Sequence, residues 1–205
     1  MAIDLAELDR RRFDAVVIGG GINGASSAQH LAAAGYAVLL VDKGDFASGS
    51  SGRSTRMLHC GLCYFETPRP VRDFLFHPLR LRTALTMARA SMRTRAELAT
   101  DSPGRLMPYT LCFPIHEDGP YKAWHLDLGF KILGTLGPKT VPLDYRRLPA
   151  EAARALPFVN QLANPERLHS VATFREYMLD WPERFCIDAV LDAERMGTVV
   201  RNHKA

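Results

Sequence analysis

The most informative spacing in this chain joins three glycines, Gly19, Gly21 and Gly24, to an aspartate, Asp42. In a turn from strand to helix, the first glycine allows a tight turn, the second lets a pyrophosphate approach the backbone, and the third lets the helix pack closely. Free N–H groups at the start of the helix favour the phosphates. A carboxylate after the next strand accepts hydrogen bonds from the ribose hydroxyls and disfavours a 2′-phosphate. We therefore predict a dinucleotide site and expect NADP to be excluded.

The sequence around these residues supplies the elements that must position them. The apolar run 13–18 predicts a strand, and the small residues of 22–34 predict a helix that lies close to a sheet. Gly35 is expected to end that helix. The nearly continuous apolar run 37–41 predicts a parallel strand buried on both faces. Together these elements predict a Rossmann-like βαβ unit.

A serine- and glycine-rich segment, 44–56, follows the second predicted strand. It is expected to be a loop that leads into a short helix. The alternative is that this segment is a plain linker. Because the segment comes directly after the strand, a loop that faces a ligand is favoured. A domain that binds NAD usually continues with another regular βα unit, whereas here the serines are followed by Arg56 and His59. This difference favours FAD over NAD, although a plain NAD-dependent Rossmann enzyme stays open.

The run GGGINGA and the run LLVDKGDFASGSSGRSTRMLHCGLCYF resemble the N-terminal region of the FAD-dependent glycerol-3-phosphate dehydrogenases, within the wider D-amino-acid-oxidase-like flavoproteins. The resemblance is dense over 13–65 and thinner over 105–115, 124–137 and 174–202. It implies an α/β fold, with a Rossmann-like FAD-binding βαβ domain and an inserted, partly helical capping segment. It also implies a chain that is incomplete relative to the family, an N-terminal fragment.

The resemblance also implies site residues. It assigns FAD binding to Gly19, Gly21, Ile22, Asn23, Gly24, Asp42, Lys43, Ser50, Ser51, Ser54, Arg56 and His59, and it places Tyr64 by the substrate pocket. The family's catalytic acid or base lies downstream of residue 205, so no catalytic residue is predicted here. Two positions depart from the family pattern: Cys60 replaces a glycine, and Cys63 replaces an arginine.

The implied reaction is oxidation of the C2 hydroxyl of glycerol 3-phosphate to dihydroxyacetone phosphate, with hydride transfer to flavin N5 and a quinone as electron acceptor. Two alternatives stay open: a fragment that binds FAD or ADP without turnover, and another D-amino-acid-oxidase-like flavoenzyme. The departures at Cys60 and Cys63 argue against efficient catalysis on glycerol 3-phosphate. Cys60 adds a side chain beside the flavin, and the loss of an arginine at Cys63 removes a cation near a phosphate-bearing substrate.

Three domains are predicted: an FAD-binding core over 12–66, an inserted segment over 67–173, and a return to the FAD-binding domain over 174–205. Within the insert, 71–99 predicts an amphipathic helix that Pro78 interrupts and whose solvated basic face carries Arg72, Arg80, Arg82, Arg89, Arg93 and Arg95. The run 148–156 predicts a short helix.

Within the third predicted domain, a helix is expected from Pro182 onward. Cys186, Ala189, Val190 and Ala193 recur at the i, i+3, i+4 and i+7 spacing of a buried helix face. Gly197 is expected to close this helix, and 198–201 predicts a strand.

Bulk properties exclude several classes of protein. The net charge of +4 comes from arginines spread along the chain, so a nucleic-acid-binding tract is not predicted. No apolar run approaches the length of a membrane span. We expect a cytoplasmic protein with peripheral contact to the inner face of the membrane. The four cysteines are expected as free thiols; a redox pair of Cys60 and Cys63 is the alternative, and no metal is expected.

Overall fold

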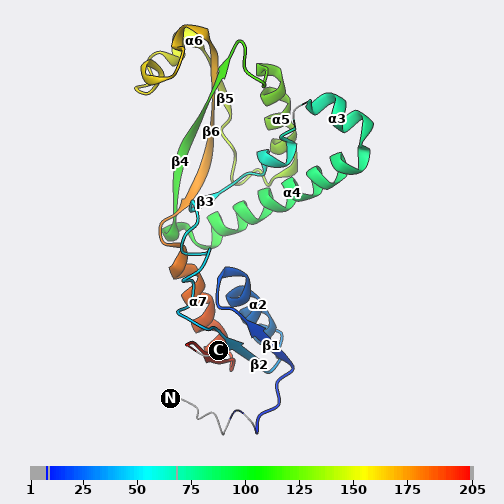
Figure 1. Ribbon diagram of the computed structural model, residues 1–205, viewed down its shortest axis with the longest axis vertical. Coiled ribbons are helices and arrows are strands. Elements are labelled where there is room, and N and C mark those ends of the chain that lie inside the picture. The colour runs from blue at the N-terminus through cyan, green and yellow to red at the C-terminus, as the bar shows by residue number, and fades with distance from the viewer. Residues whose placement is uncertain (1–7, 9, 68, 204–205) are drawn as a thin grey trace. The chain divides into compact units, whose positions relative to one another are not determined.

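The computed structural model describes residues 8, 10–67 and 69–203, and Figure 1 shows its elements. The chain divides into two compact units. The first is formed by residues 1–56 with residues 181–205, and the second by residues 57–180. The two units have separate hydrophobic cores. No helix in the described part of the chain is long and apolar enough to cross a membrane.

The first unit contains a parallel three-stranded sheet in the order β1-β2-β7. Its strands are β1 (Ala15–Ile18), β2 (Val38–Val41) and β7 (Val199–Arg201). Helix α2 (Ile22–Ala33) connects β1 to β2, and α7 (Pro182–Arg195) leads into β7. Both helices are followed by a glycine with positive φ, Gly35 and Gly197. The predicted α/β fold with a parallel βαβ unit is therefore confirmed.

Helices α2 and α7 bury one face of this sheet with small side chains. The core joins Ala25 and Ala28 of α2 to Cys186 and Ala193 of α7, over Leu40 of β2. Small side chains allow the two helices and the sheet to pack closely. On the other face of the sheet, Ile18 is 86% exposed. The helices of the described residues therefore cover only one face.

The second unit is built on an antiparallel sheet in the order β3-β6-β4, and β5 also pairs with β6. The strands are β3 (Met57–Leu58), β4 (Leu106–His116), β5 (Arg146–Pro149) and β6 (Leu168–Leu179). The long pairing of β4 with β6 dominates the unit (Figure 1). Because β4 is an edge strand, it tolerates Pro108 and Pro114, which lack an N–H group.

Four helices accompany this sheet: α3 (Pro70–Phe76), α4 (Pro78–Asp101), α5 (Ala123–Leu136) and α6 (Ala150–Ala153). Short 3₁₀ turns lie at Leu62–Phe65, Pro103–Arg105, Val159–Gln161 and Pro165–Arg167. The main core joins Met92 of α4 and Phe130 and Leu133 of α5 to Phe174 of β6. Phe130 also stacks on Tyr145, with the ring centroids 4.3 Å apart.

Three sequence-based expectations about local structure are wrong. Residues 44–56 form consecutive turns and no helix, because Ala47 has positive φ and its N–H bonds back to Gly20. The helix expected over 148–156 is limited to Ala150–Ala153, since residues 146–149 pair with β6. Arg95, expected on a solvated helix face, is 0% exposed because its guanidinium bonds to backbone carbonyls inside the unit.

Other expectations hold. Pro78 separates α3 from α4, as expected of a proline in a helical run. The buried face of α7 carries Cys186, Ala189, Val190 and Ala193, as the spacing predicted. The domain limits 12–66, 67–173 and 174–205 stay a prediction, and residues 68, 204 and 205 lie outside the described residues.

Candidate functional site

The glycine turn between β1 and α2 depends on a missing side chain. Gly19 has a φ of +99°, which a residue with a Cβ rarely adopts. A Cβ on Gly24 would lie 1.8 Å from the carbonyl oxygen of Gly19. Only glycine at position 24 therefore lets the first turn of α2 come this close to the end of β1. The turn leaves Ile22 and Asn23, at the start of the helix, exposed.

The loop after β2 folds back onto this turn. The backbone N–H of Ala47 donates to the carbonyl of Gly20 at 3.0 Å. The N–H of Ile22 donates to Ser51 Oγ at 2.9 Å, so this serine satisfies one of the free donors at the helix start. A Cβ on Gly20 would collide with the ring of Phe46. The loop therefore packs against the turn, and its predicted role as a loop that faces a ligand stays a prediction.

Asp42 ties the ends of β1 and β2 together. Its carboxylate accepts the N–H of Gly20 at 2.6 Å and the N–H of Gly44 at 2.8 Å. The bond from Gly44, the bond from Gly20 and the nearby positive charge of Lys43 hold the pKa of Asp42 below its usual value. The carboxylate is therefore ionised at neutral pH. A carboxylate has about four lone-pair sites, so it keeps acceptor capacity for further donors.

Of the predicted cofactor residues, a first group gathers around these two strand ends in the first unit: Gly19, Gly21, Ile22, Asn23, Gly24, Asp42, Lys43 and Ser51. Ser50, Ser54 and Arg56 lie further along the same loop. Ser54 Oγ accepts the N–H of Arg56 at 3.2 Å, and so supports the local turn. The sequence did not indicate Phe46, because an isolated aromatic residue in a serine-rich loop carries no periodic signal. The ring of Phe46 leaves no room for a Cβ at Gly20.

His59 and Tyr64 belong to the second unit, and both are exposed. Between them, Cys60 and Gly61 are buried. A Cβ on Gly61, where φ is +90°, would lie 3.0 Å from the Cα of Ala88 in α4. Cys60 is 1% exposed, so the side chain that replaces the family's glycine lies in the core of this unit. Cys63 is exposed, and both cysteines are free thiols.

The arrangement in the first unit can bind an anion next to a group of hydroxyls. The N-terminus of α2 carries exposed N–H groups and the positive end of the helix dipole, which together favour phosphate. The ionised Asp42 lies at the neighbouring strand end, where it can accept hydrogen bonds from hydroxyl groups. A phosphate ester of a sugar has this combination of charge and donors.

A family model described as FAD dependent oxidoreductase matches residues 14–205. Among curated relatives, a glycerol-3-phosphate dehydrogenase of Synechocystis sp. is 30% identical over 97% of this chain, which covers 33% of that protein. A D-erythritol 1-phosphate dehydrogenase of Brucella abortus is 34% identical over 66% of this chain, which covers 25% of it. The chain thus spans about a third of the length of the first of these relatives.

Solved structures show the same fold. The glycerol-3-phosphate dehydrogenase from Bacillus halodurans complexed with FAD matches 97% of this chain and 28% of its own, with a TM-score of 0.59 and 22% identity. The FAD-bound L-alpha-glycerophosphate oxidase from Mycoplasma pneumoniae matches 94% of this chain and 45% of its own, with a TM-score of 0.61 and 18% identity. At these identities the likeness concerns the fold alone.

The substitution Asp42→Asn should make stability less dependent on pH. Because folding lowers the pKa of Asp42 from 3.8, its carboxylate stabilises the folded state above that pH, and the contribution is lost as the pH falls through the folded value. Urea unfolding should therefore show a wild-type advantage over Asp42→Asn at neutral pH that shrinks below pH 3.8. Asp45→Asn controls for loss of a negative charge from the same loop. An advantage that stays constant on acidification contradicts the assignment.

Proposed function

Because this chain belongs to the FAD dependent oxidoreductase family, we propose that its glycine turn holds the pyrophosphate of FAD and that Asp42 holds the ribose. FAD is the cofactor of this family. When bound, it supplies an acceptor for hydride. The observation that carries the proposal is the junction of two features: an exposed helix N-terminus at one strand end and an ionised carboxylate at the next.

The residues present fit this group. Gly21 caps α2, and within the described part of the chain Ser51 Oγ, at 3.1 Å, is the one heavy atom near a Cβ built on it, so an approaching phosphate meets backbone rather than a packed side chain. The first turn of α2 itself carries no acidic residue that would repel a phosphate. The acidic Asp42 lies one strand away, where it disfavours a 2′-phosphate.

The other predicted cofactor residues extend the proposal toward the flavin ring. Ser50, Ser54 and Arg56 offer hydroxyl, N–H and guanidinium donors beyond Ser51 in the same loop, and His59 follows in the chain. Tyr64 is the candidate on the substrate side. These roles rest on the resemblance to glycerol-3-phosphate dehydrogenases and on the exposure of His59 and Tyr64.

We propose glycerol 3-phosphate as the substrate and a quinone as the electron acceptor. Relatives named for glycerol 3-phosphate and for D-erythritol 1-phosphate share one substrate class, a polyol with a phosphomonoester. The reaction would remove a hydride and a proton from a secondary alcohol. Reduction of an artificial electron acceptor that depends on glycerol 3-phosphate tests this, and FAD binding without such turnover would favour the alternative of a binding protein.

The substitution Gly21→Ala should separate folding from FAD binding. The new methyl group meets only the movable Ser51 hydroxyl, so the chain should still fold. The methyl group occupies the space through which the pyrophosphate approaches, and we expect FAD affinity to fall at least about tenfold. Quenching of flavin fluorescence measures the affinity, and circular dichroism measures the fold.

Gly49→Ala, in the loop after β2, is the matched control, because a Cβ at that position meets nothing within 4 Å among the described residues. It should bind FAD as the wild type does. Equal FAD affinity for Gly21→Ala and Gly49→Ala would contradict the pyrophosphate assignment, even if both proteins remain yellow.

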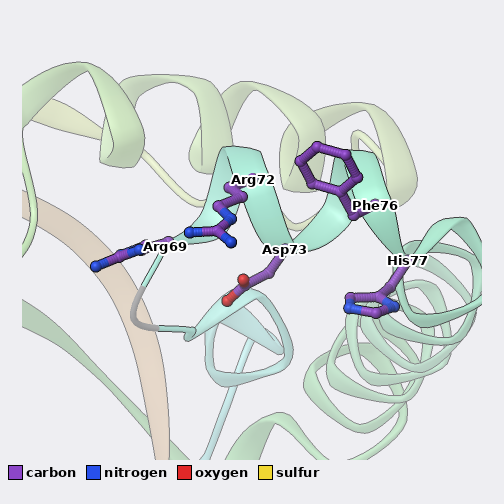
Figure 2. A pocket seen from close by; sticks show the side chains of 5 residues that line it. All are labelled: Arg69, Arg72, Asp73, Phe76 and His77. Atoms are coloured by element: carbon purple, nitrogen blue, oxygen red, sulfur yellow. The ribbon is translucent and has the colours of Figure 1, made fainter.

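We further propose that α3 and the start of α4 contact an anionic membrane surface. Leu75, Phe76 and Leu79 are 73%, 69% and 76% exposed, which is unusual for large apolar side chains so close together. Figure 2 shows Arg69, Arg72, Asp73, Phe76 and His77 lining one pocket along α3. Apolar side chains flanked by arginines suit the boundary between lipid headgroups and acyl chains.

Replacing Leu75 and Phe76 by Glu should weaken vesicle binding. Two new negative charges would meet anionic headgroups, and two apolar anchors would be lost. Co-sedimentation with phosphatidylglycerol vesicles should capture the wild type and little of the double variant. Leu128→Glu, on an exposed position of α5, is the control and should sediment normally. Capture of the double variant at the wild-type level would refute this surface.

A further inference from the structure

We propose that Glu176 is a positioning residue: held by Arg95, it fixes the backbone of Cys60 and thereby the exposed side chains of His59 and Tyr64. The inference rests on the proposed function, in which His59 and Tyr64 lie at the flavin and the substrate. All the contacts that carry it lie within the second unit.

Arg95 and Glu176 form a buried charge pair. Arg95, on α4, is 0% exposed, and Glu176, on β6, is 1% exposed. The Nε atom of Arg95 lies 3.6 Å from Oε2 of Glu176. Taking two charges out of water costs free energy that a pair repays only with further bonds, so such a pair is weak evidence for stability alone. The remaining contacts of the two side chains show what the pair holds.

The guanidinium of Arg95 bonds two other parts of the unit to α4. Its Nη1 donates to the carbonyl of Val141 at 2.8 Å, and its Nη2 donates to the carbonyl of Arg175 at 2.9 Å. Its carbon also lies 4.9 Å from the centroid of the Tyr177 ring. Arg95 is therefore fixed in place from several sides, and it presents Nε to Glu176 at a defined position.

Glu176 in turn holds the chain at Cys60. Its Oε1 accepts the backbone N–H of Cys60 at 2.9 Å, across 116 residues of sequence. Burial, together with the negative charge of Glu176, raises the pKa of the Cys60 thiol, so the thiol stays protonated and can donate to the same carboxylate. With Gly61 packed against Ala88 of α4, residues 60 and 61 are held between a helix and a strand.

The second carboxylate oxygen of Glu176, Oε2, faces the charged guanidinium of Arg95 without a hydrogen bond. Within the described residues, Glu176 Oε2 and Arg95 Nε have no hydrogen-bond partner, and neither does the buried hydroxyl of Tyr109, which faces Glu176 across β4 and β6. A pair kept for stability would be expected to satisfy these atoms. The bond that is made with good geometry is the one to Cys60, next to His59.

Two double variants isolate that bond. Arg95→Met with Glu176→Gln and Arg95→Met with Glu176→Leu both remove the charge pair, and a buried pair replaced as a whole is often tolerated. They differ in one respect: glutamine can accept the N–H of Cys60, and leucine cannot. Hydrogen exchange of the Cys60 amide should be at least about tenfold faster in the leucine variant. FAD affinity and the visible flavin spectrum should change in the same order.

Leu133→Ala controls for loss of stability, because Leu133 is fully buried in the same core and does not bond to Cys60. It should accelerate exchange across the unit and not at Cys60 selectively. Arg93→Met controls for loss of an arginine from α4, since Arg93 forms an exposed pair with Glu97. Equal Cys60 exchange in the two double variants would overturn the proposal.

The wild-type protein provides a test that does not depend on the variants. Its Cys60 amide should be protected as strongly as the amides of β6, and an unprotected Cys60 amide would overturn the proposal. If the wild type binds no FAD, the proposed function fails, while the exchange result still decides whether Glu176 fixes Cys60. If exchange responds as expected and flavin binding does not, the role of His59 at the flavin fails instead.

Discussion

The Asp42 carboxylate is the interaction on which the first unit depends. It joins the turn after β1 to the turn after β2 through the N–H groups of Gly20 and Gly44. Two adjacent parallel strands thus end in one hydrogen-bonded structure, and helix α2 starts from it. The same carboxylate is the acceptor that a ribose needs. Structure and proposed binding therefore use one side chain.

This junction requires close packing as well as charge. Helix α2 can start where it does because Gly24 has no Cβ to meet the carbonyl of Gly19. Alanines on α2 and α7 continue that close approach along the sheet. A single added methyl group at Gly24 would move the helix start, and with it the N–H groups proposed to bind the pyrophosphate.

In the second unit, the candidate residues His59 and Tyr64 are held by the buried residues next to them. His59, Cys63 and Tyr64 are exposed, and they flank a short buried stretch of backbone at Cys60 and Gly61. The Cys60 side chain is buried in the core of this unit, and its thiol and backbone N–H share the Glu176 carboxylate. The departure from the family pattern at Cys60 is thus accommodated inside the unit. Cys63, the other position expected to depart from the family pattern, lies on the surface.

Much of the first unit could be predicted from the sequence, and less of the second. Gly19, Gly24 and Asp42 are at fixed offsets that only one local geometry satisfies, so the βαβ unit follows from them. The pairing of β4 with β6 could not be predicted, because Pro108 and Pro114 argue against a long strand unless it lies at an edge. The burial of Arg95 runs against the usual exposure of arginine side chains. Its spacing from Ala88 and Met92, at i+7 and i+3, marks the buried face of α4.

The central claim is that the ends of β1 and β2 bind the adenosine diphosphate portion of FAD. The most direct test is a titration of the ¹⁵N-labelled chain with ADP, followed by amide chemical shifts. The largest shifts should fall on residues 19–24 and 42–44. Shifts that are absent there, or that are largest along α3 at residues 70–76, would contradict this claim.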